Sequence, residues 1–185
     1  LGEEEFRIHN IGAPQLDDLV DGRFSTIKEI FSNTGFDASQ DFLLVVQHPV
    51  TGEFSEAEAQ VSQVFSALNK FPQPKVVILP NNDAGSSAIR KGIETQRQGE
   101  YHVFANVKRS DYLGLLSTTI CLVGNSSSGI LEAPSFKVPV VNLGTRQNGR
   151  LRATNIIDED FDTQKIIRAI NKAMSDEFAA TNLAC

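Results

Sequence analysis

The sequence predicts an α/β fold, a doubly wound parallel sheet of the Rossmann-like kind. Two observations predict it. Short, continuous apolar runs such as residues 42–46 have the pattern of strands that are buried on both faces. These runs alternate repeatedly with stretches of helical periodicity, and parallel strands need such helices as crossover connections.

The expected elements follow one another in a regular order. A helix is expected over residues 53–71 because apolar residues such as Val61 and Phe65 recur at helical spacing. The remaining expected helices are residues 83–99, 110–117, 127–136 and 163–174, and the expected strands are residues 42–46, 76–79, 101–104, 120–123, 138–142 and 155–157. Residues 6–12 read as a further strand ending in a turn, which could belong to a region upstream.

Composition excludes several classes of protein. With 41% apolar and 22% charged residues, the 185-residue chain is ordinary globular material and is long enough for about one domain. A net charge of -6 argues against nucleic acid as a partner, and no apolar run is long enough to cross a membrane. Neither Cys121, a core residue, nor Cys185, an end thiol, belongs to a metal-ligand pattern, so no metal is expected. The low number of cysteines fits a cytoplasmic protein.

The domain organisation follows from these patterns. The chain starts at Leu1, and its one methionine is Met174, so we expect a processed N-terminus or a piece of a longer protein. We expect residues 1–12 to be the tail end of a missing N-terminal domain or a linker. Residues 13–178 then form the α/β domain, and residues 179–185 a frayed C-terminus.

Two polar loops are expected to meet in this fold. Ligands of doubly wound sheets bind at the carboxyl ends of the strands, where the strand order reverses. In the common order 3-2-1-4-5-6, the first and fourth strands are neighbours. The first expected strand leads into His48, and the fourth leads into Gly124–Gly129. A histidine in this position either lines a binding crevice or is structural.

The segment Gly124–Gly129 has the composition of a phosphate site. It opens an expected helix, whose N-terminal N–H groups suit an anion, and the hydroxyls of Ser126 and Ser127 add donors. The alternative is a serine-rich helix cap without a ligand. Glu132, within the next two turns, either accepts hydrogen bonds from a ribose hydroxyl pair or complements the helix dipole.

Two further segments leave strand ends. Arg146, Arg150 and Arg152 concentrate positive charge after the fifth expected strand. Guanidinium groups match phosphate oxygens, although a solvated basic loop is the alternative. Asn81 follows the second strand, where it either caps a helix or contacts a ligand.

Taken together, four segments in this order resemble the UDP-N-acetylglucosamine 2-epimerases. They are residues 48–51, 80–86, 124–129 with Glu132, and 142–150. The resemblance is to the hydrolysing, NeuC-like branch. The non-hydrolysing branch typically has His-Arg-Arg-Glu-Asn and Asp-Ser-Gly-Gly at the corresponding places, and this sequence has neither.

The resemblance implies a fold and a set of site residues. The family has two similar α/β domains with the active site between them, as in GT-B glycosyltransferases, and this chain resembles the second domain. The resemblance implies that Ser126 and Ser127 hold the diphosphate with Arg146 nearby, that Glu132 holds the ribose, that Val107 lies at the uracil, and that His48, as a catalytic residue, and Asn81 line the cleft.

The implied reaction converts UDP-GlcNAc to N-acetylmannosamine and UDP, in sialic acid or related nonulosonate biosynthesis. UDP is eliminated across C1 and C2 of the sugar, and water adds to the resulting glycal. The family's acid/base carboxylates lie mainly in the first domain, so we expect this chain alone to bind UDP weakly without turnover. The implied partners are the nucleotide sugar and the missing N-terminal domain, with homo-oligomerisation left open and no cofactor.

Two other readings remain at this point. A GT-B glycosyltransferase donor domain would share the fold and the diphosphate site. A non-catalytic nucleotide-binding or interaction module would keep the fold but would need neither an exposed cleft nor an arginine loop. A relative acting on another nucleotide sugar is a close variant of the epimerase reading.

Overall fold

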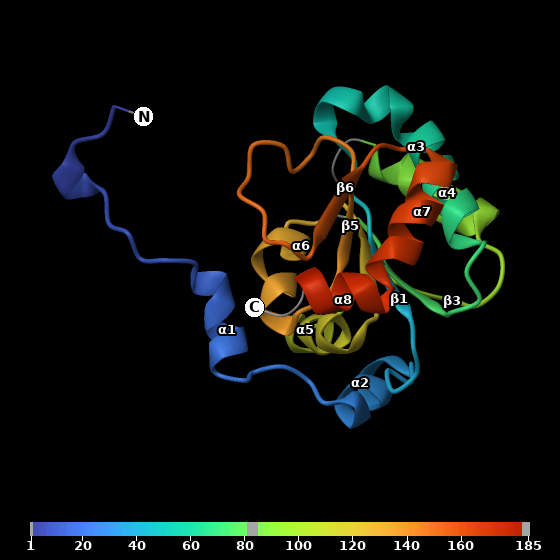
Figure 1. Ribbon diagram of the computed structural model, residues 1–185, viewed down its shortest axis with the longest axis horizontal. Helices are drawn as coiled ribbons and strands as arrows, with labels where there is room; N and C mark the ends of the chain where they lie inside the picture. The colour runs from blue at the N-terminus through green and yellow to red at the C-terminus, as the bar shows by residue number, and fades with distance from the viewer. Residues whose placement is uncertain (1, 81–84, 183–185) are drawn as a thin grey trace.

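The computed structural model describes residues 2–80 and 85–182, and a six-stranded parallel sheet forms its centre (Figure 1). The strands are β1 (Leu43–Val46), β2 (Lys75–Ile78), β3 (Tyr101–Phe104), β4 (Cys121–Gly124), β5 (Val140–Leu143) and β6 (Ile156–Glu159). Their order is β3-β2-β1-β4-β5-β6, and every neighbouring pair is parallel. This confirms the predicted doubly wound sheet, with β1 and β4 side by side at the reversal of strand order.

Helices cover both faces of the sheet. The helices of the described residues are α1 (Asp17–Val20), which lies away from the sheet, and α2 (Ile27–Thr34), α3 (Ala57–Leu68), α4 (Ser86–Gln96), α5 (Arg109–Thr118), α6 (Ser128–Leu131), α7 (Thr163–Ala173) and α8 (Asp176–Asn182). On one face, Leu43 and Val45 of β1 belong to a core with α3, α4 and α7. On the other, Leu44 and Val46 belong to a core with α2 and α5. Adjacent residues of one strand thus enter opposite cores, which explains the continuous apolar run.

The expected strand at residues 6–12 is wrong. Glu5–Arg7 forms the 3-10 turn η1, and Phe6, Ile8 and Ile11 are exposed, with 71% of Phe6 accessible. A strand needs a neighbour for its backbone hydrogen bonds, and this segment runs away from the sheet (Figure 1). Its apolar residues have the sequence pattern of a strand, but the segment does not form one.

Two expected helices are shorter than predicted. Residues 51–56 form the 3-10 segment η3 (Thr51–Glu56), with a kink at Glu53, before α3 begins. The helix expected over residues 127–136 is one turn, α6, followed by the 3-10 turn η4 (Ala133–Phe136). Pro134 disfavours α-helical geometry in the residue before it and cannot donate a backbone hydrogen bond, which accounts for this break.

Helix α2 is not among the elements predicted from the sequence. Its N-terminus carries a capping box, in which Glu29 N–H donates to the Thr26 hydroxyl while the Glu29 carboxylate accepts from the Thr26 N–H. Asn33 of α2 also donates to the buried Asp111 of α5 at 2.9 Å. The Thr-x-x-Glu spacing is the sequence signal that could have located this helix.

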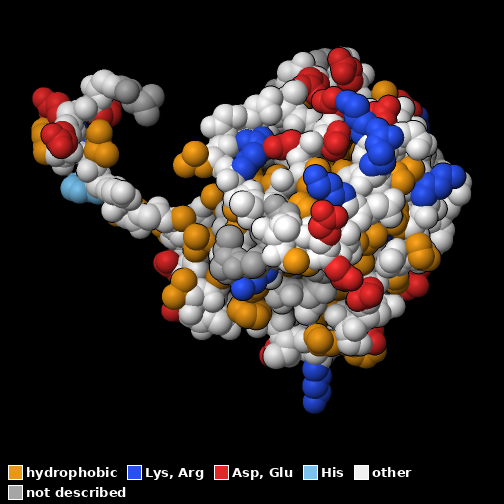
Figure 2. Space-filling model, viewed as in Figure 1, with side chains coloured by type: hydrophobic (Ala, Val, Ile, Leu, Met, Phe, Trp, Pro, Cys, Tyr) orange, Lys and Arg blue, Asp and Glu red, His pale blue; other side chains and the backbone are white. Residues whose placement is uncertain are grey.

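The surface in the view of Figure 1 shows acidic and basic side chains interspersed over the sheet domain (Figure 2). The N-terminal segment extends from this domain as a narrow arm with orange apolar side chains. Within the described residues, no helix has the length and apolarity needed to span a bilayer.

Candidate functional site

A cavity of about 480 Å³ opens at the carboxyl ends of β1, β2 and β4. Residues that follow these strands line it, together with residues from α4, α5 and the loop after β3. They include His48, Pro80, Arg90, Asn106, Tyr112 and Ser126. The two loops that were expected to meet do so here, since His48 and Ser126 share the wall.

Asn125 joins these two loops. Its side-chain oxygen accepts a hydrogen bond from the His48 N–H at 2.7 Å, and its amide donates to the His48 carbonyl at 2.9 Å. The Asn125 backbone N–H donates to Val46 O at 3.1 Å, and the residue is 0% exposed. A buried side chain with both amide groups bonded to one neighbouring backbone fixes the position of that backbone.

Gly124 allows this close approach. Its φ is +135°, and a Cβ at this position would lie 2.2 Å from Val46 O. Any other residue would be strained and would push β1 and β4 apart at the strand ends. The close approach of β1 and β4 therefore explains why a glycine occupies position 124, without reference to a ligand.

Two side chains from the loop after β5 contact the backbone of Asn125. Arg146 Nη1 and Gln147 Nε2 both donate to the Asn125 carbonyl, at 3.1 and 2.8 Å. Gln147 is buried, whereas Arg146 is exposed, so its charge is accessible beside the serine loop. Arg152 instead pairs with Asp158 of β6 at 2.6 Å and is not part of this group.

Hydroxyl groups line the other side of the cavity. Ser126 Oγ lies 3.0 Å from Ser128 Oγ, and Ser128 Oγ also contacts the Tyr112 hydroxyl. Burial raises the pKa of Tyr112 to about 12, so the hydroxyl is protonated at neutral pH. Ser127 is partly exposed at the start of α6. Because α6 is one turn long, its helix dipole is weak, and hydroxyl groups and the Arg146 guanidinium are the stronger candidates to contact an anion.

Glu132 is not among the residues that line this cavity. Its side chain is 7% exposed, and its Oε1 pairs with Arg109 Nη2 at 2.8 Å. Val107 is half-buried two residues before Arg109, next to Asn106, which lines the cavity. Asn81 lies outside the described residues, although the preceding Pro80 lines the cavity.

Several residues of this site were not assigned from the sequence. Asn125 and Ser128 lie inside the segment that was singled out, but their roles depend on contacts across the fold. The partners of Arg109, Tyr112 and Gln147 have no sequence signal at all, since each contact joins separate elements.

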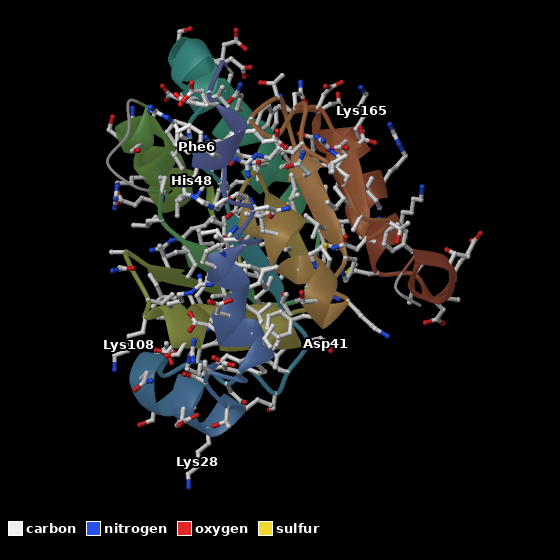
Figure 3. All side chains as sticks on the ribbon, turned by 90° about the vertical axis from the view of Figure 1, so that its left-hand side faces the viewer. Phe6, Lys28, Asp41, His48, Lys108 and Lys165 are labelled. Carbon is white, nitrogen blue, oxygen red and sulfur yellow. The ribbon has the colours of Figure 1, made fainter. Side chains whose placement is uncertain are left out.

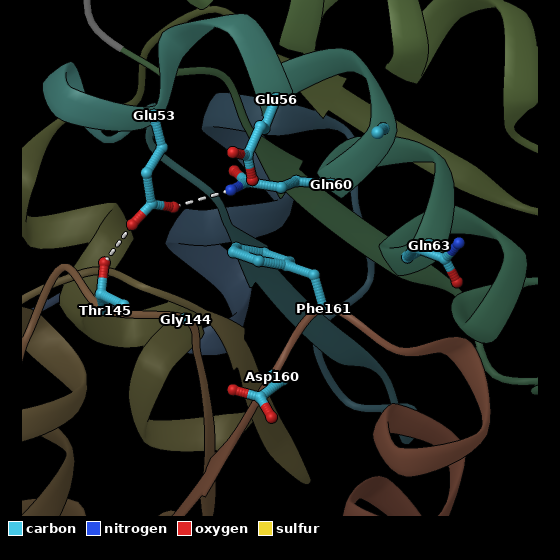
Figure 4. Close-up of a pocket in the computed structure, with 9 residues that line it drawn as sticks. Glu53, Glu56, Gln60, Gln63, Gly144, Thr145, Asp160 and Phe161 are labelled. Atoms are coloured by element: carbon cyan, nitrogen blue, oxygen red, sulfur yellow. Dashed lines mark hydrogen bonds between the residues drawn. The ribbon is translucent and has the colours of Figure 1, made fainter.

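A second, larger cavity of about 550 Å³ lies at the carboxyl ends of β5 and β6 (Figure 4). Glu53, Glu56 and Asp160 line it, with the Phe161 ring between them. Lys165 pairs with Asp160 at 2.8 Å, which leaves a net negative surface. Such a cavity repels a diphosphate, so the smaller cavity is the better candidate for a nucleotide.

Metal ligation has no visible basis in the residues that the structure describes. Among residues 2–80 and 85–182, no group of three or more His, Cys, Asp or Glu side chains could hold a metal ion. The polar side chains in and beside the smaller cavity, among the described residues, carry hydroxyl, amide, imidazole and guanidinium groups.

Comparison with known proteins identifies the family of this chain. A family model described as UDP-N-acetylglucosamine 2-epimerase matches residues 1–184. A UDP-N,N'-diacetylbacillosamine 2-epimerase (hydrolyzing) of Legionella pneumophila is 33% identical over 177 residues, which are 95% of this chain and 47% of that protein. A UDP-N-acetylglucosamine 2-epimerase of Neisseria meningitidis is 33% identical over 175 residues, 95% of this chain and 46% of that protein. The chain thus spans about half the length of the relatives it matches.

Solved structures show the same fold. A Neisseria meningitidis UDP-GlcNAc 2-epimerase bound to UDP-GlcNAc has a TM-score of 0.69 at 17% identity, over 89% of this chain and 46% of that one. A Methanocaldococcus jannaschii UDP-GlcNAc 2-epimerase in complex with UDP-GlcNAc and UDP has a TM-score of 0.68 at 14% identity, over 96% and 51%. Because the family model covers nearly the whole sequence, this chain belongs to the UDP-N-acetylglucosamine 2-epimerase family.

Proposed function

We propose that this chain is the nucleotide-binding half of a hydrolysing UDP-GlcNAc 2-epimerase. One observation carries the proposal: Asn125 locks His48 against the serine loop, beside the cavity at the reversal of strand order. Polar donors from two distant segments are thereby fixed around a space large enough for part of a nucleotide sugar.

The diphosphate is assigned to the serine side of this cavity. Ser126 and Ser127 offer hydroxyl donors, and Arg146 places an exposed guanidinium beside them. These groups suit a leaving diphosphate, because negative charge grows on it as the C1–O bond breaks. Val107 and Glu132 are assigned to the uracil and the ribose, on the side of the site where α5 begins.

In this proposal the chemistry divides between this chain and the part of the relatives that it does not cover. Elimination breaks the C1–O and C2–H bonds of the sugar, releases UDP and leaves a glycal, to which water then adds. His48 lies where it can assist proton transfer or stabilise the leaving group. Glu132 is engaged with Arg109, so we do not assign it as the base for the C2 proton. We therefore expect this chain to bind UDP weakly and to release none from UDP-GlcNAc by itself.

The relatives' names support the hydrolysing branch and leave the sugar open. The Legionella relative is named for UDP-N,N'-diacetylbacillosamine, whereas the Neisseria relative is named for UDP-GlcNAc. An Escherichia coli relative, 29% identical, is named polysialic acid biosynthesis protein P7. We propose UDP-GlcNAc as the substrate, with N-acetylmannosamine passing to sialic acid or a related nonulosonate.

Calorimetric titration of the 185-residue chain with UDP and GDP tests the proposal. Arg146→Ala and the double variant Ser126→Ala/Ser127→Ala should each weaken UDP binding about tenfold, as expected for lost charge-assisted hydrogen bonds. Arg168→Ala, on the exposed face of α7, is the matched control and should leave binding unchanged. A preference for GDP would move the substrate to another nucleotide sugar. Failure to bind either nucleotide would contradict the assignment of the nucleotide to this chain.

A further inference from the structure

Arg109, the first residue of α5, contacts two carboxylates that belong to different parts of the chain. Its Nη2 lies 2.8 Å from Glu132 Oε1, and its Nε lies 2.7 Å from Asp18 Oδ2. Nη2 also donates to the backbone carbonyl of Gln15. One guanidinium therefore bridges the proposed ribose carboxylate and the segment before the sheet.

We call residues 13–25 the connector. Its far end is fixed to α5, because Ser25 N–H donates to Ser110 O at 3.0 Å and Ser25 Oγ donates to Asp111 at 2.7 Å. Gly114 makes this contact possible, since a Cβ there would lie 2.3 Å from Ser25 O. Figures 1 and 3 both show α1 of the connector beside α5 and α6.

The two carboxylates differ in how much they depend on Arg109. Glu132 is 7% exposed, so its charge needs a partner within the protein, whereas Asp18 is 32% exposed and also pairs with Arg23 at 2.9 Å. Arg109 reaches Glu132 through Nη2, while its Nε donates to Asp18. A guanidinium and a carboxylate favour a bidentate pair, and the contact to Asp18 keeps Nε from forming such a pair with Glu132 together with Nη2.

We propose that Arg109 is a positioning residue that presents Glu132 Oε2 to the nucleotide ribose, and that Asp18 on the connector keeps it in that position. The proposal rests on the proposed function, in which Glu132 receives the ribose hydroxyls. Without Asp18, the guanidinium turns to a bidentate contact with Glu132 and occupies Oε2. The ribose then loses its acceptor, although Asp18 itself touches no ligand.

A coupling between the connector and the nucleotide follows. A nucleotide that binds Glu132 favours the arrangement in which Arg109 also holds Asp18, so it stabilises the docked connector. By linkage, a docked connector raises the affinity for a nucleotide that carries both ribose hydroxyls. The connector thus acts on ribose recognition rather than on diphosphate binding.

Titrating the 185-residue chain with UDP and with 2′-deoxy-UDP tests this proposal. The unaltered chain should prefer UDP about tenfold, the usual effect of one hydrogen bond to a charged acceptor. Asp18→Asn should weaken UDP binding about fivefold or more, toward the affinity for 2′-deoxy-UDP, which should change little. Arg109→Gln should also lower the preference. Lys108→Gln removes the same charge from an exposed neighbour and should keep the preference (Figure 3).

Each result decides between the two proposals. A chain that binds no UDP, or binds both nucleotides equally, overturns the proposed role of Glu132 and this inference with it. A chain that prefers UDP, and keeps that preference in Asp18→Asn, overturns the coupling alone. Equal weakening of both nucleotides in Asp18→Asn also overturns it, because that would be a loss of folding or of general charge balance. Asp18→Asn is the decisive variant since it removes the Asp18 charge and keeps both Arg109 and the buried Glu132, and Asp18→Glu should restore the preference.

Discussion

Two cavities at the carboxyl edge of the sheet have similar volumes, about 480 and 550 Å³, and different chemistry. The cavity beside β1 and β4 is lined by His48, Ser126 and Tyr112, whereas the cavity beside β5 and β6 is lined by Glu53, Glu56 and Asp160. The same topology creates both, because parallel strands end at one edge and their loops diverge there. The difference shows that the sheet provides a location, while side-chain charge and hydroxyl donors determine which anion or cation can bind.

The largest effect should come from breaking the contact that builds the first cavity. Asn125→Ala removes two hydrogen bonds from the buried Asn125 side chain to the partly buried backbone of His48. We expect a loss of about 2–4 kcal/mol in the free energy of unfolding and at least a tenfold loss in UDP affinity. Denaturant unfolding measures the loss of stability, and calorimetry measures the loss of UDP affinity. Asn148→Ala, at an exposed position of the loop after β5, should change neither.

If Asn125→Ala kept its UDP affinity, the joined loops would not be the binding site. A loss of stability without a loss of affinity would have the same meaning, because the cavity wall would then be irrelevant to the ligand. The control at Asn148 separates these results from a general weakening of the loops.

This example also shows how far the sequence predicted the site. The strands were predicted because both faces of the sheet are buried, which makes their sequences continuously apolar. The meeting of the two loops followed from a common strand order alone. The side-chain bond from Asn125 to His48, 77 residues away in sequence, could not be predicted, because an asparagine after a strand equally well caps a turn.

Other features were unpredictable for different physical reasons. The helix opened by the serine loop is one turn long, since Pro134 interrupts a pattern that otherwise reads as helical. Glu132 was placed near the ribose by resemblance, but its pairing with Arg109 joins α5 to the end of α6 and has no local signal. The arm at residues 6–12 has the apolar residues of a strand, but among the described residues it pairs with none of the six strands of the sheet.

Exchanging charge between the two cavities should give the next largest effect. Arg146→Glu places a negative charge beside the serine loop, so we expect UDP affinity to fall by about tenfold to a hundredfold. Glu56→Lys makes an equal and opposite change in the acidic cavity and should alter UDP affinity less than about twofold, because salt screens distant charges. Calorimetry at two salt concentrations measures both. A stronger response to Glu56→Lys than to Arg146→Glu would place the nucleotide in the acidic cavity.

Tyr112 offers a pH test of the first cavity. Burial raises its pKa to about 12 and also raises the pKa of Tyr101, the other tyrosine, above its usual value near 10. The folded chain should therefore show little tyrosinate absorbance at pH 10.5, whereas the unfolded chain should show it from about pH 10. Because the folded state keeps the protons, stability should be complete below pH 10 and should fall as pH rises from about 10 toward 12.

The same residue bears on the ligand. Tyr112→Phe removes the hydroxyl that contacts Ser128, and UDP affinity should fall about fivefold. The affinity of the unaltered chain should show no titration of Tyr112 between pH 7 and 9. Tyrosinate absorbance that rises at the usual pH in the folded chain would contradict the buried position of Tyr112.

The smallest effect compares one hydroxyl from each cavity. Ser126→Ala removes a hydroxyl from the first cavity and should weaken UDP binding about threefold, since a neutral hydrogen bond contributes roughly 1 kcal/mol or less. Thr145→Ala removes a hydroxyl that donates to Glu53 at 2.5 Å in the acidic cavity (Figure 4), and UDP affinity should stay the same. Calorimetry on both variants resolves this difference if the protein concentrations are matched. Equal affinities would mean that Arg146 and the backbone N–H groups hold the diphosphate without help from the serine hydroxyl. The loop would then contribute to binding through the position of its backbone and not through the Ser126 side chain.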